Sequence, residues 1–274
     1  EIRFCDWSSD VCSSDLDAVD ERRSVRAPVV YEIIRQEGVE ELERPMVSLW
    51  WSGVASGLAI SASIFSQGYF HLHLADAPWR PLVENLGYCV GFIIVILGRF
   101  QLFTEQTVKA ILPLLSDRTW DNFTRTARLW IIVLIANLAG AFCAALFGTL
   151  SAGTSAAQLA AFQDLSLQFV DKGPLQLLML GIPAGFLIAA LAWVLPSAEG
   201  SKFWAILVVT YVIALGGFAH VVASAVEVFL VLIAGQITPW HAFGGVLLPA
   251  LIGNILGGTA LFSLIAYAQV REEI

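Results

Sequence analysis

The sequence predicts an all-α membrane protein with six transmembrane helices. Hydrophobic residues make up 57% of its 274 residues and charged residues only 14%, whereas a soluble domain carries about a quarter charged residues. Two of the apolar stretches are interrupted by polar residues near their middle. Six apolar stretches each reach the roughly 20 residues that a helix needs to cross the hydrocarbon core, and they cover residues 46–66, 86–115, 129–150, 175–195, 203–234 and 242–268.

The N-terminal part of the chain is expected to lie outside the membrane. Residues 1–27 predict a disordered or artefactual tail: its first sixteen residues resemble translated sequencing-adapter sequence, and it lacks the apolar segment of a signal peptide. Residues 28–44 predict an amphipathic cytoplasmic helix, which Pro28 can begin. This helix either lies on the membrane face or pore mouth, or extends the first span into solvent. Residues 45–270 then form a single six-span domain.

Composition excludes several other classes of protein. The net charge of −8 comes without the basic patch that a nucleic-acid partner requires. Two of the four cysteines, Cys89 and Cys143, lie in apolar stretches, so no disulfide framework is indicated. His71 and His73 stand two residues apart without further ligands, so we expect no metal site, and nothing in the chain indicates a cofactor.

The distribution of positive charge predicts the topology. The segments between spans are expected to be loops, including the long stretch 151–174. One side of the predicted membrane has only Arg80 and Lys172. By the positive-inside rule, the opposite side is cytoplasmic and holds both termini. That side carries ten basic residues: Arg22, Arg23, Arg26, Arg35, Arg44, Arg118, Arg125, Arg128, Lys202 and Arg271.

The two polar interruptions occupy corresponding places in the chain. The second stretch is interrupted from Gly98 to Thr107, and the fifth from Gly216 to His220. Six spans divide into two halves of three with opposite orientation, so each half has its break in its second span. Such paired breaks are typical of inverted-repeat transporters, whose site lies near the middle of the membrane. Non-helical backbone at that depth is tolerated only inside protein or beside a wet cavity.

Two side chains at the breaks are the strongest candidates for chemistry. A histidine within the membrane is costly without a partner or a wet cavity, so His220 is a candidate pore residue. The alternative is a packing histidine that is bonded to a backbone carbonyl. Thr104 could present its hydroxyl, and the N–H groups of a half-helix, to an anion. It could also be an N-cap, followed by Thr107.

A third polar residue, Arg99, requires a partner if it is buried. The sequence offers Glu105 and Glu227 for an ion pair. Glu105 and Lys109, four residues apart, are expected to pair along one helix face.

Several short motifs resemble the formate/nitrite transporter family over residues 28–268. What the resemblance implies is a homopentamer with an aquaporin-like protomer fold, an inverted repeat of three plus three spans, and broken helices 2 and 5. It also implies one pore per protomer, small monovalent anions such as formate, nitrite, hydrosulfide or lactate as substrates, and a place in the bacterial inner membrane. The motifs are Gly91-Phe92, Leu102-Phe103-Thr104, Asn137-Leu138-Ala139-Gly140-Ala141, Gly217-Phe218-Ala219-His220 and Gly253-Asn254-Ile255-Leu256-Gly257-Gly258.

The resemblance also implies roles for particular residues. The pore or substrate residues would be His220, Thr104, Ser224, Asn137, Asn254 and Lys172. The constrictions would be formed by Tyr88, Phe92, Leu102, Phe103 and Ile213. The gating loop would contain Arg99, Phe100 and Gln101, where the family usually has small and acidic residues. Ala219 and Ser224 also depart from the Glu and Asn that are common in the family. The chain therefore resembles a divergent branch.

The expected function is the passage of a small weak-acid anion, alone or with a proton. His220 would provide a proton or a hydrogen bond between apolar constrictions. One alternative is a channel for neutral solutes, although paired Asn-Pro-Ala motifs are absent. The other is an intramembrane hydrolase using His220 and Ser224, although the chain has no G-x-S-x-G or H-E-x-x-H motif. We therefore expect a transporter and not an enzyme.

Overall fold

The computed structural model describes residues 25–273, and over this range the protein is helical, without β-strands. The all-α class is thereby confirmed. The tail predicted at residues 1–27 lies outside the described range except for its last three residues, of which Ala27 begins a helix. The helices are α2 (Ala27–Glu43), α3 (Met46–His73), α4 (Arg80–Glu84), α5 (Cys89–Leu97), α6 (Phe103–Lys109), α7 (Ile111–Ser116), α8 (Trp120–Leu150), α9 (Ala156–Val170), α10 (Pro174–Val194), α11 (Lys202–Leu215), α12 (Val221–Ile233), α13 (Leu248–Ile255) and α14 (Leu264–Val270).

Within residues 25–273, five helical segments are long and apolar enough to cross a membrane. The short apolar helix α12 adds to them. The exact count of six crossings and the domain limits 45–270 stay predictions. The five segments are Met46–His73, Arg80–Leu97, Trp120–Leu150, Pro174–Ser197 and His241–Val270.

Short irregular helices complete the second half of the chain. Two 3₁₀ turns, η1 (Leu195–Ser197) and η2 (Glu199–Ser201), link α10 to α11. Two π-helical segments, η3 (His241–Leu247) and η4 (Leu256–Ser263), flank α13.

Two tight helix pairs form the frame of the molecule. α3 lies against α8, and α10 lies against α13 and η4. Glycine permits the approach at equivalent points of both pairs. A Cβ atom on Gly57 would overlap the carbonyl oxygen of Asn137, and one on Gly185 would overlap that of Asn254. Small residues are common at such contacts between membrane helices.

The backbone leaves the helix at the two predicted positions, between α5 and α6 and between α11 and α12. Both helices end in the same turn. Phe100 N–H donates to Val95 O and Phe218 N–H donates to Ile213 O, each at 3.0 Å. The preceding residue is left-handed in both, with φ of 54° at Arg99 and 58° at Gly217. The first interruption is shorter than expected, because the helix resumes at Phe103 and not after Thr107.

The helices that follow the breaks cross to the other half of the molecule. α6 contacts α10, α13 and η4, whereas α12 contacts α8 and α3. α5 and α11 contact each other directly. The residues at the two breaks are therefore brought together at the centre of the helical frame.

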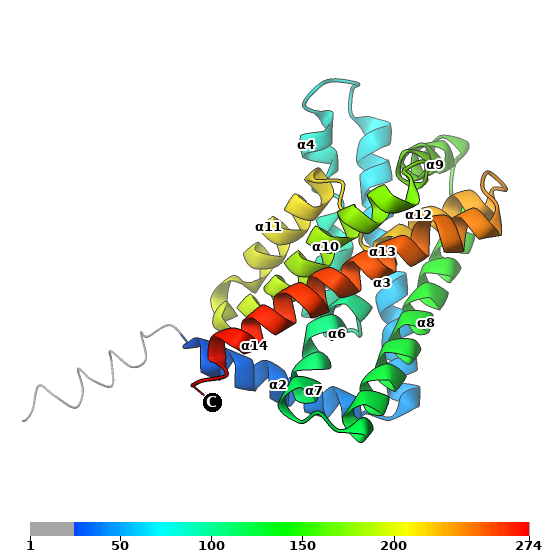
Figure 1. Ribbon diagram of the computed structural model, residues 1–274. Coiled ribbons are helices and arrows are strands. Elements are labelled where there is room, and N and C mark those ends of the chain that lie inside the picture. Colours follow the sequence, from blue (N-terminus) through cyan, green and yellow to red (C-terminus); the bar gives the residue numbers. More distant parts are fainter. Residues whose placement is uncertain (1–24, 274) are drawn as a thin grey trace, which may run out of the picture.

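The first described helix, α2, closes one end of the molecule (Figure 1). Its apolar face is buried beside α7, α14 and the end of α10, and it includes Val30, Tyr31 and Ile34. Ser116 Oγ donates to Leu112 O, so the Tyr31 hydroxyl donates to Ser116 at 2.7 Å. A helix thus covers nearly all of residues 28–44, and its cytoplasmic location stays a prediction. Figure 1 places α2 and the end of α14 together, with α4 and α9 at the opposite end.

One expectation about the connections was wrong. The stretch 151–174 contains α9 and is not simply a loop. A capping box starts this helix: Gln158 N–H donates to Ser155 Oγ at 3.2 Å, and Ser155 N–H donates to Gln158 Oε1 at 2.8 Å.

Candidate functional site

The two breaks meet at one hydrogen bond between side chains. His220, the residue before α12, is completely buried, and its Nε2 lies 2.7 Å from Thr104 Oγ1. Its Nδ1 accepts the N–H of Ala223 at 3.2 Å. A ring nitrogen that accepts an N–H carries no proton, so the proton of the neutral imidazole lies on Nε2. Nε2 therefore donates to Thr104, and the threonine hydroxyl hydrogen remains available to another acceptor.

Thr104 does not cap its helix, contrary to one interpretation of the sequence. Leu102 is the N-cap of α6 and makes no side-chain capping bond. Thr107 Oγ1 donates to Thr104 O at 2.7 Å, within the first turns of the helix. The Thr104 hydroxyl is consequently directed to His220. Leu102 and His220 occupy equivalent places, each directly before a helix that follows a break.

An aromatic ring packs against the histidine, which is itself completely buried. The Phe92 ring meets the His220 ring edge to face at 4.9 Å between centroids, and Tyr88 follows at 5.1 Å from Phe92. Leu102 and Ile213 are completely buried in the same apolar core. All five expected constriction residues, including Phe103, lie in this core.

Within this core, the Phe103 ring packs against Trp130 of α8, at 5.8 Å between ring centroids.

Two asparagines hold the breaks through matching sets of hydrogen bonds. Asn137 Oδ1 accepts from Phe103 N–H at 2.9 Å, and its Nδ2 donates to Gly53 O and Gln101 O at 2.9 and 2.8 Å. In the other half, Asn254 occupies the same position. It accepts from Val221 N–H at 2.9 Å and donates to Gly181 O and Ala219 O at 2.9 and 2.7 Å. Both side-chain amides therefore make all of these hydrogen bonds with backbone groups.

The remaining expected pore residues lie further along α12 or beyond it. Ser224 is one turn from His220 and donates its N–H to His220 O at 2.8 Å. Lys172 follows α9, with its ammonium 4.5 Å from the centre of the Phe169 ring. Burial lowers the pKa of Lys172, and the Glu227 carboxylate opposes that shift. Lys172 and Glu227 are therefore within electrostatic reach of each other.

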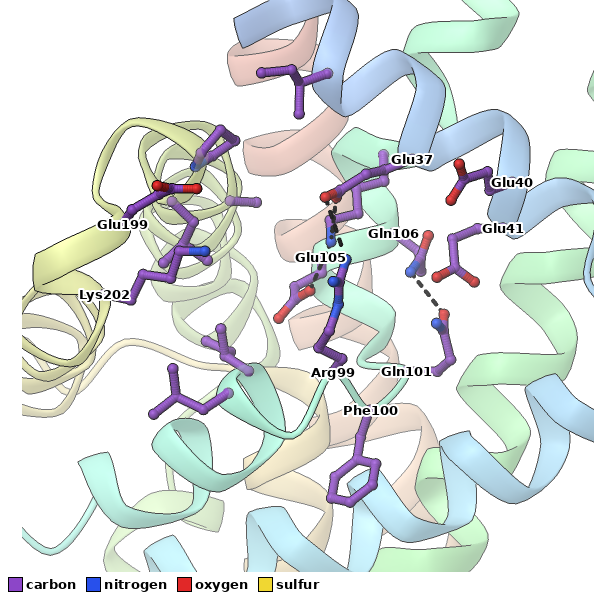
Figure 2. A pocket seen from close by; sticks show the side chains of 17 residues that line it. Glu37, Glu40, Glu41, Arg99, Phe100, Gln101, Glu105, Gln106, Glu199 and Lys202 are labelled. Carbon is purple, nitrogen blue, oxygen red and sulfur yellow. Dashed lines mark hydrogen bonds and ion pairs between the residues drawn. The ribbon is translucent and has the colours of Figure 1, made fainter. Parts of the chain in front are cut away.

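A cavity of about 360 Å³ opens beneath the first break, between that break, α2 and α6. We name it the α2-side vestibule. All three expected gating-loop residues line it, together with residues that the sequence analysis did not assign to a site. Figure 2 shows the charged and polar side chains that converge there. Its charged and amide-bearing lining residues are Glu37, Glu40, Glu41, Arg99, Gln101, Glu105, Gln106, Lys109, Glu199 and Lys202.

The ion pairs of this vestibule differ from those expected. The partner of Arg99 is Glu37 of α2, at 3.6 Å, and neither Glu105 nor Glu227. Glu37 also lies 3.0 Å from Lys109 Nζ. The expected pair of Glu105 and Lys109 is present at 3.5 Å. Glu37 was missed because hydropathy cannot show that α2 folds back beneath the break.

No metal centre is evident in the described range. Residues 25–273 contain no group of three or more His, Cys, Asp or Glu side chains that could hold a metal ion.

Comparison with known proteins places the chain in a family. The formate/nitrite transporter family model matches residues 28–268. The inner membrane protein YfdC of Escherichia coli (strain K12) is 38% identical over 256 residues, which cover 93% of this chain and 82% of that protein.

Solved structures share the fold. A structure described as an FNT family ion channel has a TM-score of 0.72 at 19% identity, covering 93% of this chain and 99% of the other. A pentameric formate channel with formate bound has a TM-score of 0.71 at 19% identity, covering 83% and 98%. Together with the family match over nearly the whole chain, these findings show that the protein belongs to the formate/nitrite transporter family.

Proposed function

We propose that the protein carries small monovalent weak-acid anions, such as formate, nitrite or hydrosulfide, through a pore in each protomer. The observation that carries this proposal is the hydrogen bond between Thr104 and His220, where two helix starts meet inside an apolar enclosure. The family is one of transporters and channels, and not of enzymes.

The geometry favours one use of the histidine over another. The Thr104 hydroxyl oxygen accepts a hydrogen bond from His220 Nε2–H. The hydroxyl hydrogen is therefore free to donate a hydrogen bond to an anion that reaches Thr104. If the neutral imidazole gave its Nε2 proton away, it would become an imidazolate. We therefore favour hydrogen-bond donation through Thr104, with the proton arriving from solvent together with the anion.

The apolar rings then favour the neutral acid over the charged form. A charge that leaves water for a site lined by Phe92, Tyr88 and Leu102 loses solvation. A weak acid avoids this loss by taking up a proton, which converts the anion and H⁺ into the uncharged acid. The acid passes the constriction and releases the proton on the other side.

The two alternative functions have less support. Both ring nitrogens of His220 are occupied, by Thr104 and by the N–H of Ala223. None is left to activate Ser224, which disfavours an intramembrane hydrolase. No contact within residues 25–273 specifically favours a channel for neutral solutes.

We assign the expected pore residues different roles. Asn137 and Asn254 would hold the backbone of the breaks, since their amides are already occupied. Lys172 would attract anions at the mouth opposite α2. The loop Arg99–Gln101 would gate the vestibule.

We further propose a homopentamer in the bacterial inner membrane, with α2 and the C-terminus in the cytoplasm. The name of the pentameric formate channel supports the assembly, and that of the inner membrane relative supports the location. Figure 1 supports the topology, because α2 and the end of α14 lie at the same end.

Flux measurements in proteoliposomes test this function. We would measure the uptake of formate, nitrite and hydrosulfide between pH 5 and 8 for the wild type, His220→Asn and Thr104→Val. Thr104→Val removes the hydroxyl but keeps the shape, so flux should fall by about tenfold or more for one lost hydrogen bond to an ion. His220→Asn removes the Nε2–H that orients the Thr104 hydroxyl, so its flux should fall as well.

A matched control is Thr149→Val in α8, whose hydroxyl donates within its own helix to Ala145 O at 2.8 Å, and it should keep wild-type flux. If Thr104→Val and His220→Asn both retained the wild-type rate and pH profile, the proposed role of this pair would be rejected.

A further inference from the structure

Glu227 is an acidic residue in the middle of the apolar helix α12. Every other residue from Val221 to Val231 is buried, whereas Glu227 is only partly buried. The helix is itself packed against α3, α8 and α9. An ionisable side chain at membrane depth normally faces a partner or a wet cavity and not lipid. Glu227 therefore borders an opening inside the molecule that water can reach.

The spacing along α12 places Glu227 on the same side as the central histidine. Ser224 follows His220 by four residues and Glu227 follows Ser224 by three, so the three residues lie on one face of the helix. Seven residues correspond to about 10 Å along a helix axis. Glu227 is thus two turns beyond the hydrogen bond between His220 and Thr104.

Two residues from other elements lie near Glu227. Tyr88, whose ring centroid lies 5.1 Å from that of Phe92, is within electrostatic reach of the Glu227 carboxylate. Lys172, which follows α9, is within electrostatic reach as well. Glu227 is therefore placed between the lysine expected at the mouth of the pore and the aromatic rings that precede His220.

The carboxyl group of Glu227 has no fixed partner in the described part of the chain. Within residues 25–273, Lys172 acts on it through its charge, but no hydrogen bond to a side chain holds it. The Lys172 ammonium lies over the Phe169 ring, at 4.5 Å from the ring centroid. The two groups are close enough to act on the same small ion without being bonded to each other.

On this side of the breaks, the other titratable residues of the helices packed on α12 are bonded elsewhere or exposed to solvent. His241 of η3 lies 2.9 Å from Val170 O, and His71 of α3 lies 3.0 Å from Glu84. The exposed ones are Tyr69, His73, Cys143, Asp164 and Asp171. Lys172 and Tyr88 are therefore the groups that face Glu227.

An anion bound to Lys172 would favour the protonated form of Glu227. A negative charge beside a carboxyl group disfavours its ionisation, and a protonated carboxyl has an O–H that it can donate. His220 is a poorer proton donor, because its single ring proton lies on Nε2 and its loss would leave an imidazolate. The anion thus meets an acid before it reaches the histidine.

We propose that Glu227 is the residue that exchanges a proton with the anion at the mouth beside α9. As the anion enters, the O–H bond of the Glu227 carboxyl breaks and the proton is bonded to the anion, which gives the neutral acid and a Glu227 carboxylate. Solvent at the mouth then returns a proton to the carboxylate, and passage in the opposite direction reverses both transfers. The inference rests on the proposed passage of weak-acid anions and adds to it the group that supplies the proton.

Formate uptake into proteoliposomes at pH 5 and pH 7.5 tests this role. Glu227→Gln keeps the shape but cannot give up a proton. At pH 7.5, where solution contains little formic acid, its uptake should fall about tenfold or more, as for the loss of a general acid. At pH 5 the solution supplies more neutral acid, so the fall should be about threefold or less. Glu227→Asp keeps a carboxyl and should retain most of the uptake at pH 7.5.

The direction of the effect separates proton exchange from simple electrostatics. The loss of a negative charge beside Lys172 should by itself strengthen the attraction of anions. It would then raise uptake, or lower the half-saturating formate concentration, at both pH values. Proton exchange instead requires a lower maximal uptake at pH 7.5. The matched control Asp164→Asn removes an exposed carboxylate of α9 and should keep the wild-type pH profile.

Unchanged or raised uptake by Glu227→Gln at pH 7.5 would overturn the inference. If Glu227→Gln is not recovered as folded protein, Glu227→His replaces it. Histidine titrates near about pH 6.5 and aspartate near about 3.9, so the pH profiles of Glu227→His and Glu227→Asp should differ by about one unit or more; identical profiles would reject the role of Glu227.

The wild type separates this inference from the proposed function. Wild-type uptake together with an unaltered pH profile in Glu227→Gln would reject proton exchange at Glu227 and leave anion passage standing. A wild type that carries no anion at either pH would reject the proposed passage and, with it, the role of Glu227.

Discussion

Replacement of either asparagine that holds a break should cost a large and similar amount of stability. Asn137→Leu leaves Phe103 N–H and Gln101 O without their partner, and Asn254→Leu does the same to Val221 N–H and Ala219 O. Each stranded buried group costs about 1–3 kcal/mol. Either variant should therefore lose about 2–6 kcal/mol of unfolding free energy, and the two losses should agree within about 1 kcal/mol because the bonds lost are the same.

The loss can be measured by unfolding in mixed detergent micelles with increasing dodecyl sulfate, monitored by far-ultraviolet circular dichroism. Asn85→Leu is the control, since its half-buried side chain accepts one bond, from Gln67 at 2.8 Å, and its loss should stay near 1 kcal/mol. A loss at Asn137 or Asn254 no larger than that of the control would refute the assignment of these amides as supports of the breaks.

Three further predictions concern the backbone and the docking of α2. Arg99→Gly should be about 1 kcal/mol more stable than Arg99→Ala, because φ is 54° there; equal unfolding midpoints would contradict this. Gly57→Ala should lose about 1–3 kcal/mol by overlap with Asn137 O, whereas Gly173→Ala, with open space around it, should stay within about 0.5 kcal/mol; equal thermal stabilities would exclude the close contact.

Tyr31→Phe should loosen α2 by about 1 kcal/mol, as seen by limited proteolysis. Burial raises the pKa of Tyr31, so its contribution to stability is present below about pH 10 and is lost as pH rises through the raised value. The variant should lack that loss above pH 10, and an identical alkaline transition would contradict the reasoning.

The breaks and His220 could be predicted from the sequence because each is a polar group inside an apolar stretch. Such a group can be recognised without knowing which residues it contacts in the fold. Hydropathy along the chain cannot show which helices and loops lie next to each other in the fold. For this reason the pairing of Arg99 with Glu37 was not predicted. The helix α9 could have been predicted, since Ser155 and Gln158 form a capping box ahead of an apolar run.

The capping interpretation of Thr104 failed for a different physical reason. Threonine has a local preference for the position before a helix, but the backbone of the break is held from outside by Asn137, which accepts the N–H of Phe103. With that N–H already satisfied, the helix begins at Phe103 without a side-chain cap. The Thr104 hydroxyl then becomes available to His220, a partner distant in sequence.

The two breaks share their backbone geometry, so their differences must come from side chains. Both breaks have the same turn and a left-handed residue at the same position of that turn. In both, an asparagine side chain bonds the backbone of the break. The residue directly before the helix is Leu102 at the first break and His220 at the second. The two breaks therefore contribute only one imidazole where they meet, and it donates its hydrogen bond to Thr104. At the left-handed position, Gly217 suits the turn, whereas Arg99 costs about 1 kcal/mol or more in backbone strain. The turn therefore does not explain the arginine, whose guanidinium lies in the α2-side vestibule beside Glu37.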